Sequence, residues 1–304
     1  MTTSRLENSV LNLLAAWGGQ VVALALVFVT RAVFARELSM DYLGLENLFS
    51  NVITILSLAE LGIGSSITFA LYKPIALGDE ETIKSLMRLF KRAYVTIGCL
   101  IAVVGIGLSP FIGLFIKDIP DIPYLSLYFI MFVANTSISY FFSYKGLLIY
   151  AYQKNYVVSL IQYGFQIALS VVQIVVLLAT HNYALFLVCM LMSTLLQNLC
   201  LSRAATKMFP FLKSSSVAPV SRSMAKGIAK NAFALTLHKI ASIASVPAGT
   251  VILTAFAGLD VVALYGSYTL LLNAVTRLLD KVYDAITASV GNLGVLESGE
   301  RQYE

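Results

Sequence analysis

The sequence predicts an all-α integral membrane protein, from its composition, its long charge-free runs and the placement of its basic residues. Apolar residues make up 58% of the 304 residues, charged residues only 12%, and the mean hydropathy is +0.82. A soluble domain carries roughly 25% charged residues. So little polar surface could not cover so large an apolar content in water. The composition therefore excludes a nucleic-acid-binding domain, a disordered scaffold and a secreted disulfide scaffold.

Charge-poor runs locate the expected membrane spans. A helix needs about 20 apolar residues to cross ~30 Å of hydrocarbon. Suitable segments are residues 8–30, 43–72, 93–116, 124–144, 155–202, 231–259 and 261–276. The run 155–202 is too long for one crossing, and Thr180, His181 and Asn182 are residues that suit a turn within it. We therefore expect about eight transmembrane helices.

The chain divides at a change of composition. The segment 203–230 holds six basic residues and no acidic one. We predict a six-helix N-terminal lobe over 1–202, a cytoplasmic basic linker over 203–230, and a partial second lobe of two helices over 231–304. A surface helix on anionic lipid is the other interpretation of the linker.

The basic residues also predict the orientation of the chain. With a cytoplasmic N-terminus, fifteen of the 21 Lys and Arg residues fall in inside segments. Outside segments hold only Arg31, Arg36 and Lys117. Because cytoplasmic loops are enriched in Lys and Arg, both termini are expected in the cytoplasm.

A weak internal repeat links the two predicted lobes. A shift of 222 positions pairs Gly44 with Gly266 and Asn51 with Asn273. The first and seventh spans both leave the cytoplasm in this topology. A six-helix unit repeated in parallel orientation would have this pattern, as in some transporters.

Three segments carry a family resemblance: residues 42–51 (YLGLENLFSN), 58–66 (LAELGIGSS) and 71–76 (LYKPIA). Through them the chain resembles the polysaccharide repeat-unit flippases (Wzx type, for O-antigen or exopolysaccharide) of the multidrug/oligosaccharidyl-lipid/polysaccharide exporter superfamily. The polar stretch 79–94, expected as a cytoplasmic connection, also fits. The resemblance covers essentially the whole chain, and residues 42–76 are its most specific part.

The resemblance implies a transporter of the bacterial inner membrane. Such proteins move an undecaprenyl-diphosphate-linked oligosaccharide from the cytoplasmic to the outer leaflet. Membrane lipid is a further partner, and a polysaccharide polymerase or glycosyltransferases are candidate partners. No enzyme activity, cofactor, metal or nucleic acid is expected, since neither a nucleophile motif nor a metal-ligand spacing is found in the sequence.

Family members have about twelve to fourteen helices in two lobes, whereas eight are expected here. The alternatives are a truncated, non-transporting remnant or partner subunit, a multidrug antiporter, and a polytopic acyltransferase or polymerase. The last would need a large charged loop outside, and the outside segments are short.

Two charges on the expected N-terminal lobe are candidate substrate-binding groups. Glu60 lies about 20 Å along the helix from Glu46 and Lys73, far from both interfaces. It is either a gate or coupling carboxylate facing the lumen, or a carboxyl that is protonated or paired with Lys145 or Lys239. Arg31 ends the first expected span. It is either a ligand of the diphosphate or an anchor at the membrane interface. A related lipid II flippase has matching acidic and Arg positions.

Two further candidates lie in the expected second lobe. Lys239 lies about 12 Å into the seventh span, as a substrate ligand or a snorkelling side chain. Arg277 shares one helix face with Asp280, Lys281 and Asp284. This face either neutralises itself where the helix leaves the membrane or lines the inner vestibule, with Arg277 reaching the substrate. Gly62 and Gly64 favour close helix packing.

Overall fold

The chain is an all-α, multi-pass membrane protein. The computed structural model describes residues 5–60, 62–117, 122–213 and 219–276, without the side chains of 5–17, 58–59, 213 and 238–246. The α-helices are α1 (Arg5–Glu37), α2 (Met40–Leu56), α3 (Ile63–Leu77), α4 (Glu80–Leu108), α5 (Leu125–Ala151), α6 (Asn155–Thr180), α7 (Tyr183–Met208), α8 (Arg222–Ala257) and a last described helix, Leu259–Thr276. Three short 3₁₀ segments are η1 (Ser57–Glu60), η2 (Ser109–Phe115) and η3 (Pro210–Lys213). No strand occurs in the described residues.

Six helices among the described residues are long and apolar enough to cross a membrane. They are Gly18–Glu37, Glu80–Phe115, Leu125–Ala151, Asn155–Thr180, Tyr183–Met208 and Leu259–Thr276. The predicted second span is not one continuous helix, because η1 separates α2 from α3. The predicted seventh span lies almost entirely within the continuous helix α8, and the apolar part of α8 with described side chains is Pro247–Ala257. The multi-pass character is thus established, and the number eight stays a prediction.

Capping residues explain where several helices begin, and two of the predicted connections are largely helical. Asp79 caps α4 by accepting a hydrogen bond from the Thr82 amide, so the expected connection 79–94 is almost entirely helical. The expected linker 203–230 is also mostly helical. Within it α7 runs to Met208, and α8 begins at Arg222 with Ser221 as its N-cap. The charged residues of these two stretches thus lie mostly within helices.

The turn between α6 and α7 confirms the predicted division of the run 155–202. α6 ends at Thr180, and His181 takes a left-handed conformation with φ 50°. Asn182 then caps α7 by accepting a hydrogen bond from the Leu185 amide. Three turn-forming residues are enough to reverse the chain between two apolar helices.

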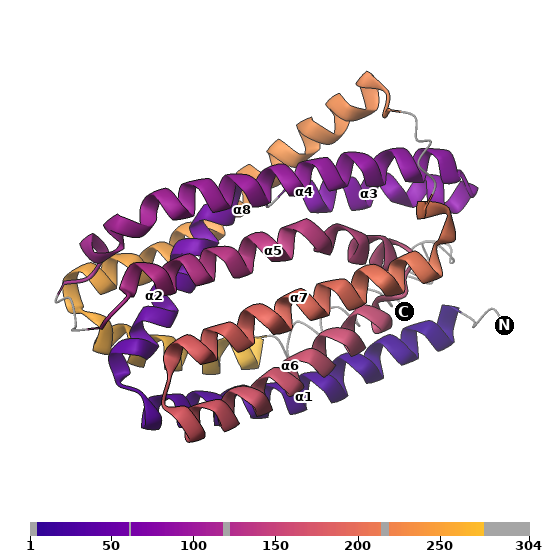
Figure 1. Ribbon diagram of the computed structural model, residues 1–304. Coiled ribbons are helices and arrows are strands. Elements are labelled where there is room, and N and C mark those ends of the chain that lie inside the picture. Colours follow the sequence, from indigo (N-terminus) through magenta and orange to yellow (C-terminus); the bar gives the residue numbers. More distant parts are fainter. Residues whose placement is uncertain (1–4, 61, 118–121, 214–218, 277–304) are drawn as a thin grey trace, which may run out of the picture.

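The helices form a layer crossed by a second group of helices. Figure 1 shows α4, α5, α7, α6 and α1 side by side, in the order in which they pack against one another. α3 packs against α4 and α5 of this layer, and α2 packs against α5. α8 in turn packs against α2 and α3. We name the two ends of the bundle by their connections. The α3/α4 end also holds the α5–α6 and α7–α8 connections, and the α1/α2 end holds the α4–α5 and α6–α7 connections.

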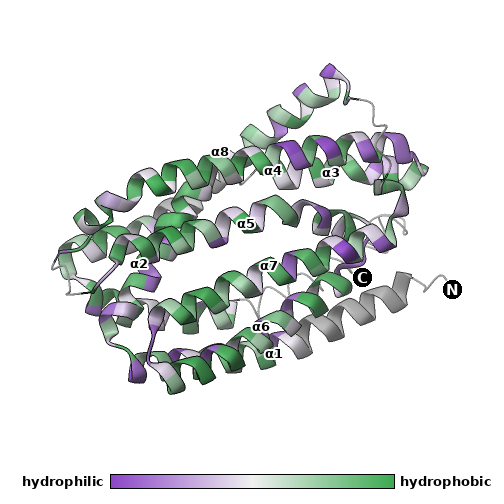
Figure 2. Ribbon diagram, viewed as in Figure 1, coloured by the Kyte–Doolittle hydropathy of each residue, from purple (hydrophilic) through white to green (hydrophobic). Residues whose placement is uncertain are grey.

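Close approach of the helices depends on small residues. Gly98 and Gly105 of α4 face Phe141 and Val133 of α5, so closely that a Cβ atom would meet these side chains. In lipid, helices associate by such packing because lipid tails are as apolar as the side chains. Apolar side chains on the outside fit this solvent, and Val103 is 71% exposed. Figure 2 shows the hydrophobic colour along most of the long helices.

Candidate functional site

Two polar cavities meet at Arg31 inside the bundle. The first cavity, of 230 Å³, lies between α1, α2, α6, α7 and the last described helix. The second cavity, of 210 Å³, lies between α1, α2, α8 and the last described helix. Arg31 and Leu270 line both. Polar side chains in a membrane-spanning bundle need partners or a ligand, so these cavities are the candidate site.

Arg31 lies within α1 and not at its end, which corrects the expected span 8–30. α1 continues for about 9 Å beyond it, to Glu37. Its Nε donates to Ser267 Oγ at 3.2 Å, and its Nη2 donates to the Ala263 carbonyl at 3.3 Å. These bonds use two of the five N–H donors of a guanidinium. Within the described part of the chain, three donors therefore remain for a ligand.

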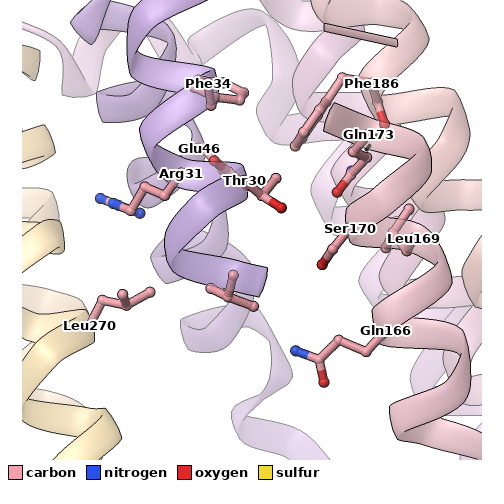
Figure 3. Close-up of a pocket in the computed structure, with 11 residues that line it drawn as sticks. Thr30, Arg31, Phe34, Glu46, Gln166, Leu169, Ser170, Gln173, Phe186 and Leu270 are labelled. Atoms are coloured by element: carbon pink, nitrogen blue, oxygen red, sulfur yellow. Dashed lines mark hydrogen bonds between the residues drawn. The ribbon is translucent and has the colours of Figure 1, made fainter. Parts of the chain in front are cut away.

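The first cavity combines this cation with a carboxylate and neutral hydrogen-bonding groups. Glu46 of α2 lines it, as do Thr30 of α1 and Gln166, Ser170 and Gln173 of α6. In Figure 3, Thr30 and Phe34 of α1 point toward α6, whereas Arg31 points toward the helix that carries Leu270. Amides and hydroxyls of this kind can donate and accept hydrogen bonds, as sugar hydroxyls require.

Glu46 and Arg31 interact electrostatically without a salt bridge. Each side chain exerts an electrostatic effect on the other. The ion pairs found in the described residues are elsewhere, and Arg36 pairs with Glu37 at 3.7 Å. Glu46 therefore shares the first cavity with Arg31 without forming an ion pair with it among the described residues.

The second cavity is lined by carboxamides from two helices. Asn47 and Asn51 belong to α2, and Asn273 to the last described helix. Asn47 Nδ2 donates to the Val262 carbonyl at 3.4 Å, which ties these helices together. Asn51 and Asn273, paired by the 222-residue shift, line the same cavity. The repeat itself stays a prediction.

Glu60 occupies a different place, at the break between α2 and α3. The Tyr94 hydroxyl donates to its Oε1 at 2.6 Å, and the Tyr140 hydroxyl donates to its Oε2 at 3.1 Å. These partners come from α4 and α5, so three segments meet at this carboxyl. Glu60 does not pair with Lys145, whose amine donates to Thr206 instead. Glu60 and Arg31 are thus not parts of one cluster.

The other two predicted site residues are not placed. Arg277 lies outside the described residues, and for Lys239 only the backbone within α8 is described. Gly62, predicted to allow close packing, does so. A Cβ atom there would collide with the Ala232 carbonyl of α8. The structure therefore describes two of the four predicted substrate-binding residues, and separates them.

The α6 side of the site was missed at the level of sequence. Gln166, Ser170 and Gln173 follow one another at spacings of four and three, which places them on one helix face. This polar stripe in an otherwise apolar run is the signal that identifies them.

Comparison with known proteins identifies no relative of this chain. No family model, no curated protein and no solved structure matches the chain.

Proposed function

We propose that the chain acts as a flippase of the polysaccharide repeat-unit type. In this proposal it moves an undecaprenyl-diphosphate-linked oligosaccharide from the cytoplasmic to the outer leaflet of a bacterial inner membrane. One observation carries the proposal: Arg31 borders two polar cavities inside a bundle of apolar helices. Arg31 lies within a helix long and apolar enough to cross a membrane, about 9 Å from its end, and charged residues inside such helices commonly mark substrate or ion pathways.

Arg31 is proposed to bind the diphosphate. A guanidinium offers paired donors that match phosphate oxygens, and three donors remain after its bonds to Ser267 and Ala263. Sugar hydroxyls would then meet the carboxamides of Gln166 and Gln173. The prenyl tail stays in lipid throughout, because only the headgroup needs polar surroundings.

Glu60 is proposed to serve as the point at which the lobe changes shape. Transporters commonly place discontinuous helices near the sites that must alternate. The break at η1 is held by hydrogen bonds from Tyr94 and Tyr140. The break is thus tied to α4 and α5 through this one carboxyl, so a change at Glu60 should alter both bonds.

The α3/α4 end is proposed to face the cytoplasm. Its helix ends and connections carry Lys73, Lys84, Arg88, Lys91, Arg92, Lys145, Lys154, Arg203, Lys207, Arg222, Lys226 and Lys230. Arg36 and Lys117 lie at the α1/α2 end. This asymmetry supports the orientation by the positive-inside rule.

Binding of a prenyl-diphosphate sugar to the purified protein tests the proposal. Arg31→Ala should weaken binding at least tenfold, and Arg31→Lys should weaken it less because a positive charge remains. Arg36→Ala is the matched control, since this side chain is exposed at the end of the same helix. Equal losses in Arg31→Ala and Arg31→Lys, or in Arg31→Ala and Arg36→Ala, would remove Arg31 from the site.

A further inference from the structure

A second set of cavities lies at the α3/α4 end, away from Arg31. One cavity, of 300 Å³, is lined by residues of α4 and α5 and by Leu212 of η3. Another, of 370 Å³, is lined by Lys145 of α5 and by residues of α7. Lys145 belongs to both, so the cavities adjoin. Their volumes reach the lower range of ligand sites, roughly 300–1,000 Å³.

The walls of these cavities are strongly basic. Their cationic side chains are Lys84, Arg88, Lys91, Lys145, Arg203 and Lys207. No acidic residue lines either cavity in the described part of the chain. Glu81 lies nearby and pairs with Lys84 at 3.0 Å. The described walls of the two cavities therefore carry a net positive charge.

Lys145 is the centre of this arrangement. It is half-buried, and its amine donates to a neutral partner, the Thr206 hydroxyl, at 3.2 Å. Lys91 lies on the same cavity and repels it electrostatically. Lys91 is exposed and lies about 16 Å from the start of α4, and Lys145 lies about 9 Å from the end of α5, so both belong to this end of the bundle.

We propose that these adjoining cavities bind a phosphate-bearing anion. A phosphate group would relieve the repulsion between Lys91 and Lys145 and accept hydrogen bonds from both amines. Two sources offer this chemistry: the headgroup of an anionic lipid and a soluble phosphate compound. The place of the cavities at the ends of apolar helices suits a headgroup. The inference is independent of transport through the Arg31 cavities, which lie toward the other end.

The experiment compares two charge-matched double variants of the purified chain. Lys91→Gln with Lys145→Gln removes two cavity charges. Lys226→Gln with Lys230→Gln removes two exposed charges from α8 at the same end. Retention of phosphatidylglycerol over phosphatidylcholine is measured by native mass spectrometry, and pyrophosphate binding by calorimetry. The cavity variant should lose at least tenfold in affinity, and the α8 variant should keep the parent value.

Phosphatidylglycerol and pyrophosphate, the two probes, distinguish a lipid headgroup from a soluble phosphate compound. Selective lipid retention that depends on the cavity charges supports a headgroup, and pyrophosphate binding alone with the same dependence supports a soluble phosphate. Lys91→Arg with Lys145→Arg should retain binding. If the Gln variant does not fold, Arg203→Gln with Lys207→Gln gives a second test on exposed side chains. Equal losses in the cavity and α8 variants, or binding of neither probe by the parent chain, would overturn the proposal.

Discussion

The Tyr94 hydroxyl donates a hydrogen bond of 2.6 Å to Glu60 Oε1, across 34 positions of sequence. Tyr94 itself is only 3% exposed. The second oxygen of Glu60 accepts a bond of 3.1 Å from Tyr140. Two tyrosine hydroxyls thus hold the carboxyl of Glu60 in η1, the segment between α2 and α3.

Tyr94→Phe should destabilise the protein by about 1–3 kcal/mol, because it removes a donor and leaves one oxygen of a partly buried carboxyl without it. Tyr140→Phe should cost less, since its bond is longer. Thermal unfolding in detergent measures both. Unfolding temperatures that match the parent protein in both variants would contradict this account of the break.

Glu60→Gln should impair surface polysaccharide without lowering the abundance of the protein in the membrane. The amide keeps the shape and an acceptor for one tyrosine, but it cannot take up or lose a proton. Complementation of a deletion strain, with immunoblotting of membranes, measures both quantities. Polysaccharide at the parental level would show that the charge of Glu60 is not used.

Gly62→Ala should lower stability, because a Cβ atom would collide with the Ala232 carbonyl of α8. The backbone of α8 would have to move, or the start of α3 would have to shift. Gly227→Ala in α8 is the matched control, since its Cβ atom meets nothing within 4 Å. That change should stabilise the protein by about 0.5–1 kcal/mol, because Ala is favoured over Gly within a helix. The same unfolding temperature for both variants would exclude close packing at Gly62.

Asp79 should make the start of α4 sensitive to acid. The side-chain bond from Thr82, and then the backbone bond from Thr82, hold the Asp79 pKa below its ordinary value of 3.8. Its contribution is present above pH 3.8 and is lost as the pH falls through the lowered pKa. Asp79→Asn keeps a capping oxygen without a titrating group.

Hydrogen exchange of the α4 amides across this pH range measures the effect. The parent protein should lose protection in the first turn of α4 on acidification, and Asp79→Asn should change less. The effect is small because the side chain is exposed. An identical pH dependence in both proteins would assign it to other groups.

The fold class could be predicted because a chain that crosses lipid needs an apolar composition and long charge-free runs, and both are visible in the sequence. The turn at His181 was found for the same reason, since one apolar run exceeded a single crossing. The break at Glu60 could not be found in this way. It depends on hydroxyl groups 34 and 80 positions distant and on the packing of Gly62 against α8. Nothing in the local sequence 57–66 names these distant partners.

Arg31 was recognised as a candidate, but its place was misjudged. Ending a span at the first charge put it at the interface, whereas α1 continues to Glu37. The reason it stays inside is its bonding to Ser267 and Ala263, more than 230 positions away. Sequence spacing cannot report such a partner.

The separation of α2 from α3 has a mechanical consequence. α2 is fastened to the last described helix, where Gly44 touches Leu259 and Asn47 bonds to Val262. α3 packs against α4 and α5, and both α2 and α3 pack against α8. A continuous rod would transmit any tilt along its whole length, but a rod jointed at Glu60 does not. A tilt of α2 would therefore reach α3 through their shared neighbour α8 and not through a continuous helix.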